Sequence, residues 1–251
     1  MRKTNLLLSL LLIPLVTTSI CFSQGSSSQA PRPAQSSESK ATPTPAPESR
    51  KRRSVAEVED AMNKGEELLF KKHDAKSSIE EFKRAIKLDP FYAQGYLLLG
   101  LAQMQLGQWT DAQWTFEEAA KVEPENAKAW LGAGSALNEQ KNFTDAQKML
   151  ERSLELRSDS AEAQYELARS LWGLGRWQAA EPHVRRAIEL NKDYAGPHAL
   201  LGNVYIQRED PEAALHEFQE CLRLDPEGRL APEVKQVIAQ LRKALGSSRQ
   251  R

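Results

Sequence analysis

Hydrophobic and small residues recur along this chain with a period of 34 residues. Within one period, Tyr96, Leu99, Gly100 and Gln103 are spaced by three, one and three residues, which is the spacing of one face of an α-helix and not the alternation of a β-strand. A second helical face follows after a short break. Its members recur in step at Phe82, Phe116, Leu150, Val184 and Phe218, and at Ala112, Ala146, Ala180 and Ala214. The pattern predicts a series of helical hairpins, one in each period.

Turn residues mark where each hairpin bends and where it ends. Gly107 and Gly175 interrupt the helical pattern in the middle of their periods, and Pro90, Pro124 and Pro226 close three of the five periods. Because proline cannot continue a helix, we expect each of these prolines to follow the end of a second helix. The other two periods lack this signal.

The first period is one residue longer than the others. Gly65 lies twenty-five residues before Pro90, whereas Gly100 lies twenty-four residues before Pro124. We expect the additional residue in the turn between Lys72 and Ser77.

These motifs resemble the tetratricopeptide repeat, whose 34-residue pattern runs W-x2-L-G-x2-Y, then A-x3-F, then A, then P. The second repeat matches it at Tyr96, Leu99, Gly100, Ala112, Phe116, Ala119 and Pro124, and the fifth at Leu201, Gly202, Tyr205, Ala214, Phe218 and Pro226. The resemblance implies an all-α fold, a right-handed α-solenoid of about five tetratricopeptide-like repeats. Within residues 54–226 the repeats occupy about 57–90, 91–124, 125–158, 159–192 and 193–226. An amphipathic stretch over 229–246 predicts a capping helix that shields the last repeat and stops at Gly246.

The first residues have the layout of a secretory signal peptide over 1–23. Arg2 and Lys3 precede an apolar run of eleven residues, which is shorter than the roughly 20 residues needed to span a bilayer. We therefore expect an exported protein, periplasmic or secreted, that is cleaved after Ser23. The alternative is a lipoprotein anchored at Cys21, although Ile20 is bulkier than the residue that lipoprotein signals place before their cysteine.

Residues 24–53 are rich in Ser, Pro and Ala and contain no aromatic residue, which predicts a disordered linker. The linker ends in the basic run Arg50 to Arg53, which could contact an anionic membrane surface, be cleaved by proteases or simply be solvated. Residues 54–251 carry 26 basic and 32 acidic side chains, a net charge of −6. This charge argues against a nucleic-acid-binding surface.

Motifs for metal binding or catalysis are incomplete. His216 and Glu217 could begin a zinc-protease motif, but Glu220 stands where the second histidine is required. Cys221 lies at a position that three other repeats fill with alanine, which predicts a buried core residue. Three other histidines lack ligand spacing and are expected on the surface: His73, His183 and His198. We therefore expect no catalysis, no cofactor and no metal.

The resemblance also implies a ligand-binding groove. In tetratricopeptide stacks the first helix of each repeat lines the concave side, and contacts come mainly from its second, fifth, ninth and twelfth positions. In the fourth repeat these are Glu162, Tyr165, Arg169 and Trp172, of which the last three share one helix face and are residue types that often anchor interfaces. Equivalent positions elsewhere add a largely apolar wall around this single cation: Leu97, Leu101 and Met104, then Leu131, Ser135 and Asn138, then Ala199, Asn203 and Ile206. Trp172 and Met104 could instead pack between adjacent repeats.

Some tetratricopeptide domains that bind chaperone tails grip a terminal carboxylate with Lys and Asn side chains, and that set is not assembled here. An apolar peptide segment or an amphipathic helix is the expected ligand. The favoured function is a non-catalytic scaffold in the cell envelope that holds another protein or peptide in its groove. The alternative is an accessory subunit that supports an envelope enzyme or a glycan-handling complex.

Overall fold

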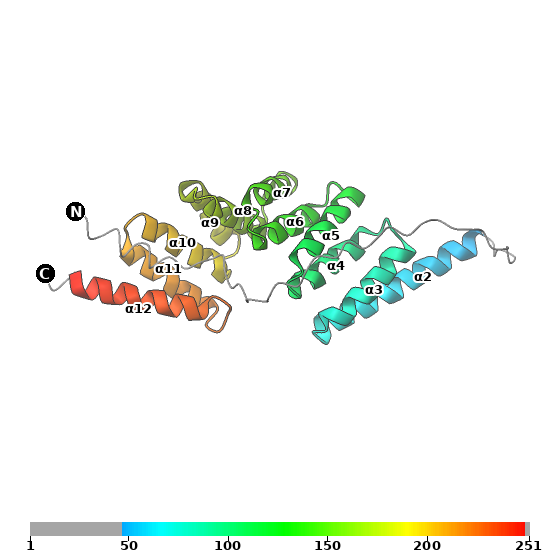
Figure 1. Cartoon of the computed structure of the whole chain (residues 1–251), viewed down its shortest axis with the longest axis horizontal. Helices are drawn as coiled ribbons and strands as arrows, with labels where there is room; N and C mark the ends of the chain where they lie inside the picture. The colour runs from blue at the N-terminus through cyan, green and yellow to red at the C-terminus, as the bar shows by residue number, and fades with distance from the viewer. Residues whose placement is uncertain (1–46, 249–251) are drawn as a thin grey trace, which may run out of the picture.

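The computed structural model describes residues 47–248, and all regular secondary structure in that part of the chain is helical (Figure 1). The predicted signal peptide and residues 24–46 of the predicted linker lie outside the described residues. The first helix, α2 (Pro47–Glu66), continues into a π-helical turn, η1 (Glu67–Lys71). The helices that follow are α3 (Ala75–Leu88), α4 (Ala93–Gln105), α5 (Trp109–Val122), α6 (Ala127–Glu139), α7 (Phe143–Leu156), α8 (Ala161–Gly173), α9 (Trp177–Leu190), α10 (Ala195–Gln207), α11 (Pro211–Leu224) and α12 (Ala231–Ser248).

The helices form hairpins that stack into an arch, as the 34-residue period predicts (Figure 1). From α4 to α11, a first helix of thirteen residues alternates with a second helix of fourteen. The first helices of successive repeats contact one another, α4 with α6, α6 with α8, and α8 with α10. In Figure 1, α5 and α7 lie on the outer side of α4 and α6. From α4 to α8, the first helices therefore line the concave side of the arch.

Small residues let the two helices of a hairpin approach closely, as the repeating glycines predict. A Cβ atom added at Gly100 would lie 2.8 Å from the ring of Phe116, and one added at Gly134 would lie 2.5 Å from Leu150. Both Phe116 and Leu150 are buried. Since real Cβ atoms do not approach this closely, the backbone at these two positions leaves no room for a side chain.

Every hairpin turn contains one residue with a positive φ at the same position of the repeat. Glycine fills this position in two hairpins, whereas His73, Lys141 and Glu209 fill it in the other three, with φ angles of 53°, 62° and 58°. Non-glycine residues incur a steric cost in this region of backbone conformation. The turn geometry is thus common to all five hairpins, but only the glycines Gly107 and Gly175 predicted it from the sequence.

The additional residue of the first repeat lies in a helix and not in the turn between Lys72 and Ser77. His73 occupies the same turn position as Gly107, 34 residues later, so this turn has its normal length. The helix before it widens into η1, where the Lys72 backbone N–H donates to the Glu67 carbonyl at 3.1 Å. A π-helical turn accommodates one extra residue while the helix on either side keeps its packing face.

The first helix starts earlier than predicted, and the last helix is shifted by two residues toward the C-terminus. Residues 47–53, which we expected in the linker, belong to α2. Pro47 suits the first position of a helix, and the Glu, Arg and Lys that follow favour helix formation. At the other end, α12 continues through Gly246 to Ser248. A single glycine costs a helix only about 1 kcal/mol, which does not end it without a competing structure.

The repeats that lack a terminal proline end at the same position as those that have one. Helices α7 and α9 end at Leu156 and Leu190, which are spaced by 34 residues from the ends of α5 and α11. The helix ends are therefore set by the packing of the next repeat, and proline reinforces them. No helix within residues 47–248 is both long enough and apolar enough to cross a membrane.

Candidate functional site

The concave side of the fourth repeat is closed by a buried ion-pair cluster. Arg169 on α8 donates from Nη2 to Glu139 Oε1 on α6 at 2.8 Å, and from Nη1 to Glu166 Oε2 on its own helix at 2.9 Å. Burial by itself would lower the pKa of Arg169, but the two carboxylates outweigh this effect and hold that pKa above its ordinary value. Arg169, expected as the single central cation of the groove, is therefore paired with two carboxylates.

Neighbouring polar groups complete this cluster. The buried Asn138 side chain on α6 donates from Nδ2 to the carbonyl oxygen of Glu166 at 2.9 Å and to its Oε2 at 2.8 Å. The hydroxyl of Ser170 donates to Asn138 Oδ1 at 2.7 Å. Since each contact joins α6 to α8, these side chains fasten the third repeat to the fourth and are not presented to a partner.

Two tyrosines close the surface between the fourth and fifth repeats. The rings of Tyr165 and Tyr194 meet edge to face with centroids 5.1 Å apart. Tyr165 lies against the start of α10, where a Cβ atom added at Gly196 would be 3.0 Å from its ring and hydroxyl. Burial raises the pKa of Tyr165 to about 12 and also raises that of Tyr194. Tyr165 is therefore a packing residue in this structure.

The concave side of the second and third repeats is more open. Leu101 at the middle of α4 is 37% exposed, and Met104 and Leu131 are half-buried. Phe70 in η1 is 50% exposed. It lies 34 residues before Met104 and so at the same position of its repeat. The sequence prediction missed Phe70 because it assigned no groove positions in the first repeat; counting back from Met104 would have found it.

The predicted groove residues thus fall into three groups by exposure. Leu101 is exposed, and Met104, Leu131, Ser135 and Trp172 are half-buried. Glu162 is exposed as well. The other predicted positions are buried: Leu97, Asn138, Tyr165, Arg169, Ala199, Asn203 and Ile206. Trp172 packs against the core beneath the fourth and fifth repeats, and Met104 against the core of the second and third, which is the alternative that the sequence left open.

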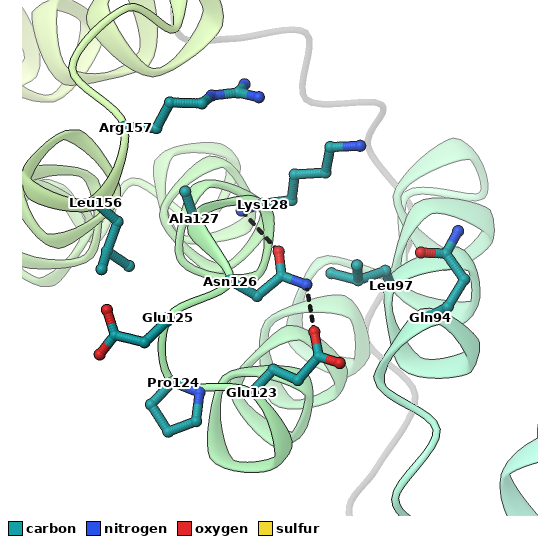
Figure 2. A pocket seen from close by; sticks show the side chains of 10 residues that line it. All are labelled: Gln94, Leu97, Glu123, Pro124, Glu125, Asn126, Ala127, Lys128, Leu156 and Arg157. Atoms are coloured by element: carbon teal, nitrogen blue, oxygen red, sulfur yellow. Dashed lines mark hydrogen bonds between the residues drawn. The ribbon is translucent and has the colours of Figure 1, made fainter.

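An open pocket of about 680 Å³ lies at the junction of the second and third repeats (Figure 2). Leu97 from α4 and Leu156 from the end of α7 contribute apolar side chains to it. Lys128 in the first turn of α6 and Arg157 after α7 contribute positive charge. The loop between α5 and α6 contributes Glu123 and Glu125. The pocket therefore offers both apolar contact and charge on the side where the first helices begin.

Two of the histidines have structural partners. His198 is buried and its Nδ1 lies 2.8 Å from Glu217 Oε2, and the half-buried His183 contacts Gln164 at 2.8 Å. The prediction of surface histidines is wrong for these two, because each faces a polar side chain on a packed helix. His73 is exposed as expected. Cys221 is buried as predicted, and burial raises its pKa to about 11. No cluster of potential metal ligands is found within residues 47–248.

Comparison with known proteins agrees with this architecture. Family models of the tetratricopeptide repeat match residues 67–107, 97–146, 125–193 and 159–227. Together these matches extend over more than half of the chain. The chain belongs to the tetratricopeptide-repeat (TPR) family. TPR domains are generally non-catalytic and mediate protein interactions. A search of curated proteins found no match to this sequence.

Solved structures of TPR proteins share the fold at low sequence identity. A structure of MamA from Desulfovibrio magneticus RS-1, starting at its residue 41, is 18% identical to this chain. The match covers 69% of this chain and 97% of the MamA chain, with a TM-score of 0.59. YrrB, described as a TPR protein with an unusual peptide-binding site, is 20% identical over 76% of this chain and 98% of its own, with a TM-score of 0.55. The TPR protein TTC0263 from Thermus thermophilus is 16% identical over 73% of this chain and 98% of its own, with a TM-score of 0.58.

Proposed function

We propose that this chain is an exported, non-catalytic scaffold that holds a segment of another protein against the open part of its concave face. Its contact surface is centred on α4 and extends from Phe70 in the first repeat to the pocket beside Lys128 in the third. The bound segment presents apolar side chains to Leu101 and its neighbours. The chain contributes binding and positioning, and its partner contributes any chemistry.

One observation carries this proposal: apolar side chains stay exposed on the first helices of the early repeats, next to an open pocket. Leaving a leucine side chain in water forgoes about 1.5–3 kcal/mol of burial free energy. Leu101 retains over a third of its exposure although it lies on a helix that is otherwise well packed. Exposed apolar residues beside a cavity are typical of surfaces that become buried by a partner.

Site-specific photo-crosslinking tests this surface. A photoreactive phenylalanine derivative is placed at Leu101 or at Phe70 in the full-length chain, in the cells that produce it. The control carries the same group at Trp114, which is 58% exposed on the second helix α5. We expect Leu101 and Phe70 to crosslink to a shared protein that Trp114 does not reach. The same products from all three positions, or none from Leu101 and Phe70, would refute the proposed groove.

Export is the second part of the proposal and has its own test. The support for it is the signal-peptide layout of residues 1–23 in the sequence. Mass spectrometry of the protein isolated from fractionated cells should find Gln24 as the first residue, in the periplasmic or secreted fraction. A lipid-modified Cys21 at the N-terminus would show that the protein is an anchored lipoprotein and not a free periplasmic or secreted protein. An intact Met1 in the cytosol would refute export.

A further inference from the structure

We propose that the pocket at the junction of the second and third repeats receives an acidic side chain of the bound segment, with Lys128 and Arg157 as its cationic partners. This inference rests on the proposed function, because it assigns a chemistry to one part of the same surface. It commits to a partner segment in which a Glu or Asp lies next to an apolar residue.

The two cations lie on one side of the pocket and extend toward the same open space (Figure 2). Within residues 47–248, no carboxylate forms an ion pair with Lys128. Arg157 forms a long ion pair with Asp159, with 4.0 Å between Nε and Oδ1, which is too long for a hydrogen bond. Both positive charges are thus available to an incoming anion, in contrast to Arg169, which has two carboxylates within hydrogen-bond distance.

The two carboxylates of the pocket are already engaged. Glu123 Oε2 accepts a hydrogen bond from Asn126 Nδ2 at 2.8 Å, and Glu125 Oε1 forms an ion pair with Arg152 Nη2 at 3.3 Å. Figure 2 shows both glutamates on the opposite side of the pocket from Lys128 and Arg157. A basic side chain entering the pocket would compete with these contacts, whereas an acidic one would meet the available donors of Lys128 and Arg157.

The apolar side chains of the pocket determine what should flank the acidic residue. Leu97 lies between the pocket and Leu101, four residues later on the same face of α4. A segment whose carboxylate enters the pocket can therefore place its neighbouring apolar residue on Leu97 and Leu101. Leu156 and Pro124 extend the apolar contact on the other side.

Binding of designed peptides to the full-length chain tests this assignment. The probe is a fluorescently labelled peptide in which Leu and Glu alternate, compared by anisotropy with peptides that carry Gln or Lys in place of Glu. We expect the Glu peptide to bind most tightly and to weaken as salt concentration rises. Lys128→Glu and Arg157→Glu should each weaken it by about tenfold and should improve binding of the Lys peptide. Lys76→Glu, an exposed lysine at the start of α3, is the matched control and should change neither.

The outcomes separate this inference from the proposed function. If the Gln peptide binds as tightly as the Glu peptide, or if the Lys76→Glu control has the same effect as the pocket variants, the acidic partner is refuted while the apolar groove stands. Failure of the Glu peptide to bind also refutes it. The crosslinking experiment at Leu101 decides the groove independently, because it does not depend on the charge of the partner.

Discussion

The same helical positions line the early and the late repeats of this TPR protein, yet they leave an open surface in one part and a closed surface in the other. Leu101 and Arg169 are two periods apart and therefore equivalent. Leu101 is partly exposed on α4, whereas Arg169 is buried between two glutamates. The position in the repeat thus places a side chain on the concave side but does not decide whether a partner can reach it.

The side chains around each position explain the difference. The two residues that bind Arg169 are Glu166 on its own helix and Glu139 on the preceding first helix. Two periods earlier these places hold Leu98 and Lys71. Neither Leu98 nor Lys71 is a carboxylate, so a cation at the position of Leu101 would have no partner there. The chain has a leucine at this position instead, and that side chain stays partly exposed. Small changes at neighbouring positions therefore convert a contact surface into an interface between repeats.

The largest expected effect is on stability, through Arg169. Arg169→Met removes the guanidinium and leaves Glu139 and Glu166 without their cation, which should lower the free energy of unfolding by about 3 kcal/mol. Leu101→Met at the equivalent position should change it by less than about 0.5 kcal/mol, because that side chain is partly exposed. Urea unfolding followed by circular dichroism measures both.

A second substitution identifies the cause of that loss. Adding Glu166→Gln to Arg169→Met should recover part of the stability, since an uncompensated charge is removed. Equal losses from Arg169→Met and Leu101→Met would contradict the closed surface of the fourth repeat.

The next largest expected effect is a difference in thiol reactivity between Cys221 and a cysteine introduced at Leu101. Burial raises the pKa of Cys221 on α11 to about 11, so the reactive thiolate is scarce near pH 8. A cysteine introduced by Leu101→Cys should have an ordinary pKa of about 8.5 and react with iodoacetamide at least about a hundredfold faster. The rate at Cys221 should rise as pH increases toward 11. Mass spectrometry resolves the two sites, and comparable labelling of both at pH 8 would show that the late repeats are as open as the early ones.

The smallest expected effect concerns the packing of Tyr165 against α10. Gly196→Ala should cost about 1 kcal/mol, because the new methyl group meets the Tyr165 ring at 3.0 Å and displaces it. Gly246→Ala is the control: that position lies in α12 with no atom within 4 Å, so alanine should stabilise the helix by up to about 1 kcal/mol. Thermal unfolding compares the two, and equal stabilisation by both would contradict the close contact between Tyr165 and α10.

Much of the fold could be predicted from the sequence because its signals are local. The spacing of Tyr96, Leu99, Gly100 and Gln103 predicts one helix face, and the recurrence of such faces predicts the stack. The failures occurred where local signals are weak. Helix α2 begins at Pro47, within the expected linker, and α12 continues past Gly246. The additional residue of the first repeat widens η1 instead of lengthening a turn. A glycine within a helix costs only about 1 kcal/mol, which packing can override.

The candidate site was predicted less completely, because exposure is not a local property. Arg169 and Trp172 are residue types that often anchor interfaces. However, Arg169 is paired with Glu139, which lies thirty residues earlier on another helix, and this pair is not visible in the local sequence. Phe70 was missed because no groove positions were assigned in the first repeat. The Lys128 and Arg157 pair arises only when the start of α6 and the end of α7 come together around one pocket.

By itself, the sequence determined the period and the helical hairpins, since these follow from the spacing of apolar and small residues along one chain. The side of each first helix that lines the concave face was implied by the family resemblance. Only the tertiary structure decided which of those positions remain accessible, because burial and ion pairing depend on side chains that adjacent repeats bring together.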